Sequence, residues 1–206
     1  MTNFTRGLRI RSGGQTGVDR AALDAAVLTG RPYEGWCPKG GWAEDFLRPP
    51  GLLTRYPHLM ETPSESPEQR TEWNVRDSAA TAVFVPDSKY NSRGTDFTIE
   101  CARKYGKPYC IIHYMDRGAI IDIKCMISRL GEERSLNIAA PRQSKHPAAY
   151  DRCLAILIEA LACQCGKNSD PNQPTENNGL LVGSLRHVRD KRTRQAEAGR
   201  AGPMEV

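Results

Sequence analysis

The fold is decided by a short run of residues near the start of the chain, Ser12-Gly13-Gly14-Gln15-Thr16-Gly17-Val18-Asp19-Arg20. This run follows a brief apolar stretch, Leu8 to Ile10, and opens a segment whose apolar residues recur with the period of a helix. Gly30 ends that segment, and Pro32 prevents the helix from restarting. The pattern predicts a strand, a glycine-rich loop and a helix, in that order.

A glycine-rich loop between a strand and a helix is a common binding place for anions. Its glycines let the backbone approach a ligand, and free N–H groups at the helix start carry partial positive charge. The spacing matches neither G-x-G-x-x-G nor G-x-x-x-x-G-K-[ST]. We interpret the loop as an anion site that a side chain in place of Gly14 would block. The alternative is a tight turn that binds nothing.

Strands and helices alternate along the rest of the chain. Predicted strands cover 31–37, 81–85, 109–112 and 136–139, and predicted helices cover 67–80, 95–106, 120–130 and 147–163. Residues 46–65 are rich in proline and predict a surface connection. The alternation indicates an α/β fold: one Rossmann-like, three-layer domain with a mostly parallel sheet and helices on both faces.

Composition limits what else the chain contains. Its 206 residues leave room for one domain, residues 7–165, followed by a basic tail, residues 166–206, which is predicted to be disordered. The net charge of +5 fits an anionic ligand, and the absence of a basic stripe disfavours nucleic acid. Seven cysteines without paired spacing indicate reduced thiols and a cytoplasmic protein. No run is long and apolar enough for a membrane span, and Cys37 has no partner at metal-ligand spacing.

Polar loops follow three of the predicted strands, at 12–17, 91–95 and 141–144. Ligands of open parallel sheets bind beyond the carboxyl ends of the strands. We expect the first two loops to be neighbours, so that Arg93 and Arg142 converge on one anion at this edge. Lys39 could reach the same anion, or it could be a solvated loop lysine.

Six stretches carry a further signal: residues 12–24, 35–40 with 43–45, 70–77, 94–95, 106–108, and 136–139 before Pro141-Arg142. Together they resemble the family of molybdenum-cofactor carrier proteins, over roughly residues 8 to 162. The resemblance implies a Rossmann-like fold, related to a wider lysine-decarboxylase-like group of nucleotide-binding proteins. It also implies binding and protection of Mo-molybdopterin by a homo-oligomer, a dimer or tetramer, with molybdoenzymes as recipients. Arg93 departs from the family pattern, which commonly has glycine there.

The residues predicted to bind the cofactor, or otherwise an unknown nucleotide, come from the loops and the resemblance together. They are Ser12, Gly13, Gly14, Gln15, Thr16, Gly17, Asp19, Lys39, Arg70, Asn74, Arg76, Arg93, Gly94, Thr95 and Arg142. No catalytic residue and no metal ligand is predicted among them.

Two other functions remain open. Phosphoribohydrolases of the cytokinin-activating type share the wider fold and carry Gly-Gly-x-Gly-Thr followed by a glutamate three residues after the Thr. That position is Thr98 here, and Glu100 lies about 200° further around a helix, so it is no simple substitute. Binding is therefore favoured over hydrolysis of a nucleoside monophosphate, with Asp19, Glu72 and Asp77 as carboxylates that could still serve an enzyme. A nucleotide-sensing module is the third possibility.

Overall fold

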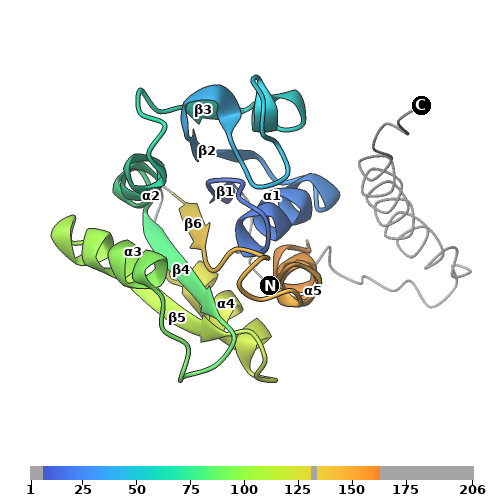
Figure 1. Ribbon diagram of the computed structural model, residues 1–206. Coiled ribbons are helices and arrows are strands. Elements are labelled where there is room, and N and C mark those ends of the chain that lie inside the picture. Colours follow the sequence, from blue (N-terminus) through green and yellow to red (C-terminus); the bar gives the residue numbers. More distant parts are fainter. Residues whose placement is uncertain (1–6, 131–133, 163–206) are drawn as a thin grey trace, which may run out of the picture. The chain divides into compact units, whose positions relative to one another are not determined.

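Six parallel strands form one sheet in the computed structural model, which describes residues 7–130 and 134–162 (Figure 1). The strand order is β3-β2-β1-β6-β4-β5, and each neighbouring pair runs parallel. The strands are β1 (Arg9–Arg11), β2 (Tyr33–Cys37), β3 (Leu59–Glu61), β4 (Ala80–Val85), β5 (Tyr109–His113) and β6 (Ser135–Ala139). The mostly parallel sheet predicted from the sequence is confirmed.

The last strand in the sequence occupies the middle of the sheet. Leu136 of β6 pairs with Ile10 of β1 on one side and with Ala80 of β4 on the other. The expectation that the loops after β1 and β4 are neighbours is therefore wrong, because the loop after β6 lies between them. Periodicity locates strands along the chain but contains no information about their order in the sheet.

Helices cover both faces of the sheet, as predicted (Figure 1). Their bounds are α1 (Val18–Leu28), α2 (Pro67–Arg76), α3 (Arg93–Lys104), α4 (Ala119–Ser128) and α5 (Ala149–Leu161). The main core joins the sheet to α1, α4 and α5, and includes Ile10, Phe84, Ile123 and Leu157. A smaller cluster, Val75 with Cys101 and Ala102, lies between α2 and α3 on the other face.

Local signals explain where these elements begin. Ser66 caps α2 by accepting the N–H of Glu68, and Pro67 takes the first helical position, as the sequence predicts. β4 is buried along its whole length, which explains its continuous apolar sequence. The predicted bounds differ from the observed ones by a few residues, most of all at α2, which ends at Arg76 and not near Ala80.

Residues 46–65 form more than a surface connection. They contain a short 3-10 helix, η2 (Gly51–Thr54), and the edge strand β3. Leu52, Tyr56 and Leu59 are buried in a second core cluster, against Leu23 of α1 and Cys37 of β2. A three-residue edge strand is too short to show periodicity, so proline dominates the pattern there.

The predictions of a tail and of no membrane span can be compared only with the residues that the structure describes. The predicted tail, residues 166–206, lies outside the described residues, as do residues 163–165 at the end of the predicted domain. Among the helices that are described, none combines the length and the apolar character that crossing a membrane requires.

Candidate functional site

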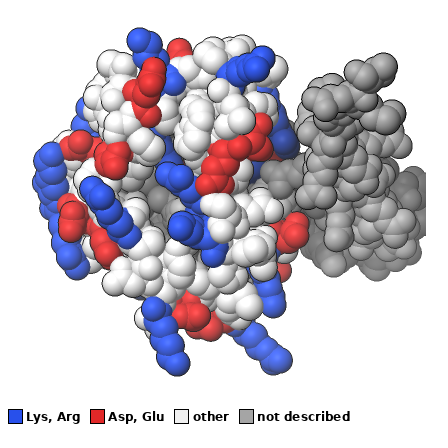
Figure 2. Space-filling model, in the orientation of Figure 1, with Lys and Arg blue, Asp and Glu red and all other residues white. Residues whose placement is uncertain are grey.

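Four loops meet at the carboxyl edge of the sheet, because parallel strands all end at the same edge. They are residues 12–17 after β1, 38–46 after β2, 86–92 after β4 and 140–148 after β6. In Figure 2, Lys and Arg atoms lie near the middle of the visible face, with Asp and Glu atoms around them.

Some N–H groups of the glycine loop after β1 already have partners within the protein. The Ser12 N–H donates to the Glu34 carbonyl (3.2 Å), and the Thr16 N–H donates to Oε1 of Gln15 (2.9 Å). The Ser12 hydroxyl donates to the carbonyl of Ile138 in β6 (2.9 Å). These bonds fix the shape of the loop, and they leave it fewer donors for an anion than the sequence suggests.

A buried ion pair occupies the start of α1. Nη1 of Arg70 lies 2.8 Å from Oδ2 of Asp19, and the two side chains are only 13% and 4% exposed. Burial raises the pKa of Asp19, while the Arg70 charge and N–H groups of Gln15 and Ala140 act in the opposite direction. A Cβ on Gly13 would lie 2.0 Å from Nη1 of Arg70. Gly13 therefore makes room for Arg70.

The other two glycines of the loop have packing roles. Gly14 has φ +70°, and its Cβ would meet side-chain atoms of Leu23, Leu52 and Leu59 at 3.2–3.3 Å. The expectation that a side chain at Gly14 would block an anion is wrong, because that side chain would enter the second core. Gly17 has φ +87°, and its Cβ would lie 2.8 Å from backbone atoms of the loop after β6.

Glu44 is a site residue that the prediction missed. It accepts hydrogen bonds from the hydroxyls of Thr16 (2.6 Å) and Ser144 (2.7 Å), and Nη1 of Arg142 lies 3.7 Å away. Partial burial alone would raise the pKa of Glu44, but these hydrogen bonds and the Arg142 charge hold it below its usual value. The only signal for Glu44 in the sequence is its place in the 43–45 stretch of the resemblance.

The start of α3 is open, and its first turn carries Arg93 and Asp96. Ser92 caps the helix by accepting the Thr95 N–H (3.2 Å), Arg93 is exposed, and a Cβ on Gly94 would meet nothing within 4 Å. The pKa of Glu68 is lowered chiefly by the Ser66 hydroxyl, and further by the charges of Arg93 and Arg142. Arg93 follows β4 and Arg142 follows β6, and these two strands are neighbours in the sheet.

Asn74 and Arg76 of α2 have structural contacts. Asn74 is buried and holds the backbone of Trp36 through its Oδ1 (2.8 Å) and Nδ2 (2.9 Å). Arg76 binds Asp77 (2.6 Å) and lies over the Trp73 ring (4.6 Å). Asn74 lies near the carboxyl end of β2, where a Cβ on Gly35 would meet both its Oδ1 and the Ser12 backbone. Arg76 is the last residue of α2, at the end that leads into β4.

In the described part of the chain, no hydrogen bond or ion pair joins the side chain of Lys39 or of two predicted carboxylates to the arginines of this edge. Lys39 is exposed in η1 (Lys39–Gly41), and only its backbone has a hydrogen bond in the described chain, to Ser64. Glu72 accepts from Lys104 (2.6 Å) and Tyr105 (2.7 Å) on the outer side of α2 and α3. Asp77 binds Arg76 and the Trp36 indole N–H (2.7 Å).

A cavity lies at the opposite edge of the sheet, away from these loops. It is lined mainly by apolar residues from the starts of β4 and β5 and from α4, including Pro108, Met126 and Leu130. None of the predicted binding residues lines it. The candidate site is therefore the carboxyl edge, where Arg70, Arg93 and Arg142 stand around the ends of three strands.

Comparison with known proteins agrees with the fold. No curated protein matches the chain. A crystal structure of a "putative molybdenum carrier protein" from Syntrophus aciditrophicus SB is 38% identical, with a TM-score of 0.62, covering 74% of this chain and 93% of that one. Residues 10–161 match the model of a single family. The chain belongs to the circularly permutated YpsA SLOG family.

Proposed function

We propose that this protein binds a small phosphorylated ligand at the carboxyl edge of its sheet, and that this ligand is the molybdenum cofactor. The observation that carries the proposal is that Arg93, at the open start of α3, and Arg142 follow β4 and β6, which are neighbouring strands of the sheet. The name of the Syntrophus aciditrophicus protein supports molybdenum, and the SLOG family membership is consistent with it.

The phosphate belongs at the start of α3, not at the start of α1. An α-helix leaves its first four N–H groups without intrahelical partners and carries about half a positive charge at this end. At α1 the carboxylates of Asp19 and Glu44 already lie beside this end. The first turn of α3 also holds one carboxylate, Asp96, but Gly94 there is open and Arg93 adds a guanidinium whose planar fork suits phosphate oxygens.

The contacts favour a carrier over a hydrolase. The hydroxyl of Thr98, which stands where the hydrolases carry a glutamate, donates to the Gly94 carbonyl (2.9 Å). Asp19 is committed to Arg70, and Glu72 and Asp77 are bound away from the site. The proposal therefore includes binding without turnover, in a cytoplasmic homo-oligomer that passes the cofactor to molybdoenzymes.

Two measurements test the proposal on the full chain. Native mass spectrometry of freshly purified protein should show a co-purified pterin. Calorimetric titration with guanosine 5′-monophosphate and ribose 5-phosphate should give binding that Arg93→Ala and Arg142→Ala each weaken about 10- to 150-fold. This range corresponds to ~1.5–3 kcal/mol for a hydrogen bond to a charged group.

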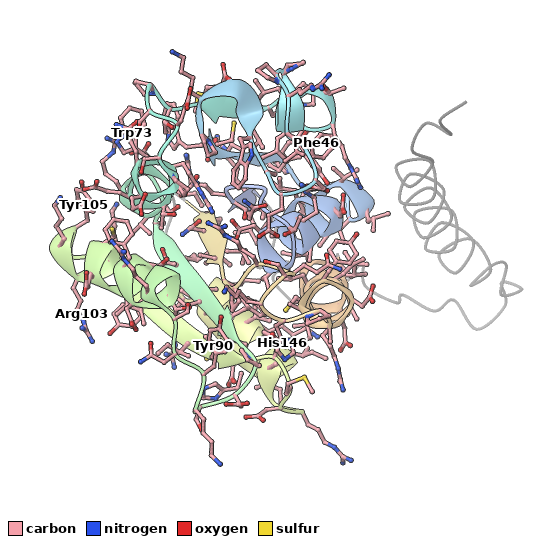
Figure 3. The ribbon with its side chains drawn as sticks, in the orientation of Figure 1. Phe46, Trp73, Tyr90, Arg103, Tyr105 and His146 are labelled. Carbon is pink, nitrogen blue, oxygen red and sulfur yellow. The ribbon has the colours of Figure 1, made fainter. Side chains whose placement is uncertain are left out.

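Arg103→Ala is the matched control. Arg103 is exposed on the same helix as Arg93 but ten residues on, about 15 Å along the axis, and it points away from the domain in Figure 3. Equal effects of Arg93→Ala and Arg103→Ala would contradict the placement of the phosphate. Release of guanine from guanosine 5′-monophosphate by the wild-type protein would show that it is a hydrolase and not a carrier.

A further inference from the structure

The aromatic side chain of Trp42 lies in one of the loops of the candidate site, and the proposed phosphate binding does not use it. Trp42 follows η1 in the loop after β2, and it is partly exposed. The Arg142 guanidinium lies 6.0 Å from the centre of the Trp42 ring. The Arg142 side chain is itself 40% exposed, so it has room to move.

We propose that Trp42 and Arg142 hold a planar ring of the ligand between them, so that the site selects phosphate esters of fused heteroaromatic rings. The inference rests on the proposed function, because it places the ring of a ligand whose phosphate is held by Arg93 and the start of α3. Stacked groups lie about 3.5–4.0 Å apart, so a ring between the two side chains needs roughly 7–8 Å. Arg142 has to withdraw by about 1–2 Å beyond its present 6.0 Å.

The chemistry of both partners suits this arrangement. A guanidinium stacks on an aromatic face while the N–H groups at its edge stay able to donate hydrogen bonds. Arg142 can therefore cover the ring and still donate to the phosphate. Trp42 offers the opposite face with a side chain that is already partly ordered by the loop.

The loop that carries Trp42 is held on both sides of the following turn. The Glu44 N–H donates to Oε1 of Gln15 (2.9 Å), and Ala43 and Phe46 exchange backbone hydrogen bonds. Asp45 accepts two hydrogen bonds from the buried Arg20, at 2.8 and 2.9 Å. Little ordering of this loop is then needed when a ligand binds.

The other two tryptophans of the chain are committed to packing. Trp36 and Trp73 contact each other edge to face, with ring centres 4.7 Å apart. Trp36 also donates to Asp77, and Arg76 lies over Trp73. Trp42 is therefore the tryptophan whose fluorescence should respond to a ligand bound at the carboxyl edge.

The test compares two probes that differ only in the base, guanosine 5′-monophosphate and ribose 5-phosphate. Trp42→Leu should weaken the binding of guanosine 5′-monophosphate roughly 5- to 150-fold, the range for one stacked base. The binding of ribose 5-phosphate should be unchanged. Trp42→Phe should retain part of the lost affinity. Circular dichroism verifies that both variants are folded.

Fluorescence gives an independent measurement. The chain has three tryptophans, so in the Trp36→Phe/Trp73→Phe variant only Trp42 remains. Guanosine 5′-monophosphate should quench its emission, and ribose 5-phosphate should not. Should the variant not fold, the wild-type protein and Trp42→Leu are compared, and only the former should show the quenching.

The outcomes separate the two proposals. If guanosine 5′-monophosphate binds no tighter than ribose 5-phosphate, or if Trp42→Leu weakens both equally, the stacking role is overturned while the phosphate site stands. If Arg93→Ala affects neither probe, or if neither probe binds the wild-type protein, the proposed function itself fails.

Discussion

Arg70→Met tests the buried ion pair at the start of α1. The substitution keeps much of the apolar stem of Arg70 but leaves the Asp19 carboxylate, 4% exposed, without its cation. Removing one partner of a buried pair typically costs about 3–5 kcal/mol. Asp19 has an alternative to staying charged, however, because it can take up a proton.

Protonation sets an upper limit on the cost, and the limit depends on pH. Neutralising a carboxyl whose unfolded pKa is about 3.9 costs ~1.4 kcal/mol per pH unit, which gives about 4 kcal/mol at pH 7 and about 1.5 kcal/mol at pH 5. The folded-state pKa of Asp19 is already raised by burial, so its contribution to stability is lost as pH rises. Loss of Arg70 raises this pKa further, and the deficit of the variant therefore grows with pH.

Urea unfolding of both proteins at pH 5, 6 and 7 measures this difference. We expect Arg70→Met to lower the free energy of unfolding by about 3–4 kcal/mol at pH 7 and by no more than about 1.5 kcal/mol at pH 5. Adding Asp19→Asn should remove the pH dependence of the difference, because no carboxylate is left to titrate. The same loss at both pH values, or a loss below about 1 kcal/mol at pH 7, would refute the reasoning.

Two further predictions concern the loops around the site. Gly17→Ala should lower the free energy of unfolding by more than ~2 kcal/mol, because it combines a positive φ with a Cβ 2.8 Å from the backbone of the loop after β6. Gly30→Ala, with φ +64° and no atom within 4 Å, should lower the free energy of unfolding by only ~1–2 kcal/mol, the cost of the left-handed backbone conformation. Equal losses for the two variants in urea unfolding would contradict this difference. Glu44→Gln should tighten the binding of ribose 5-phosphate up to about fivefold, because Glu44 competes with the phosphate for Arg142. This factor corresponds to one exposed ion pair. Unchanged or weaker binding in calorimetry would show that Glu44 does not compete.

The fold could be predicted from the sequence where local patterns are strong. β4 reads as a continuous apolar run because it is buried on both faces, and α2 begins at a capping serine followed by proline. Such signals depend on a residue and its near neighbours. They therefore survive without any knowledge of the rest of the chain.

The order of the strands could not be predicted in the same way. β6 is inserted between β1 and β4 by pairing across more than fifty residues, and nothing in its five residues specifies those partners. The strand β3 was not predicted, for a related reason. It is three residues long, and its burial depends on contacts of Leu59 with Leu23 and Cys37 in distant elements.

The candidate site was predicted in its position but not in its contacts. Arg93 and Arg142 follow strands in the sequence, and loops after parallel strands share an edge, so their place at one edge of the sheet followed from the fold class. Asn74 and Arg76 also carry suitable chemistry, but their partners are Trp36 and Asp77. A polar residue shows what it can bind, whereas its actual partner depends on the packing of the helix that carries it.

The charges at this edge favour the proposed phosphate over a carboxylate as the group that a ligand presents. Arg142 already has a singly charged partner in Glu44, whose Oε1 lies 3.7 Å from Nη1 of Arg142. A ligand carboxylate would only replace an interaction that the protein supplies itself. A phosphate monoester carries a charge of about −1.5 to −2 at neutral pH and three acceptor oxygens, so the proposed ligand can interact with Arg93 and Arg142 together and outcompete Glu44.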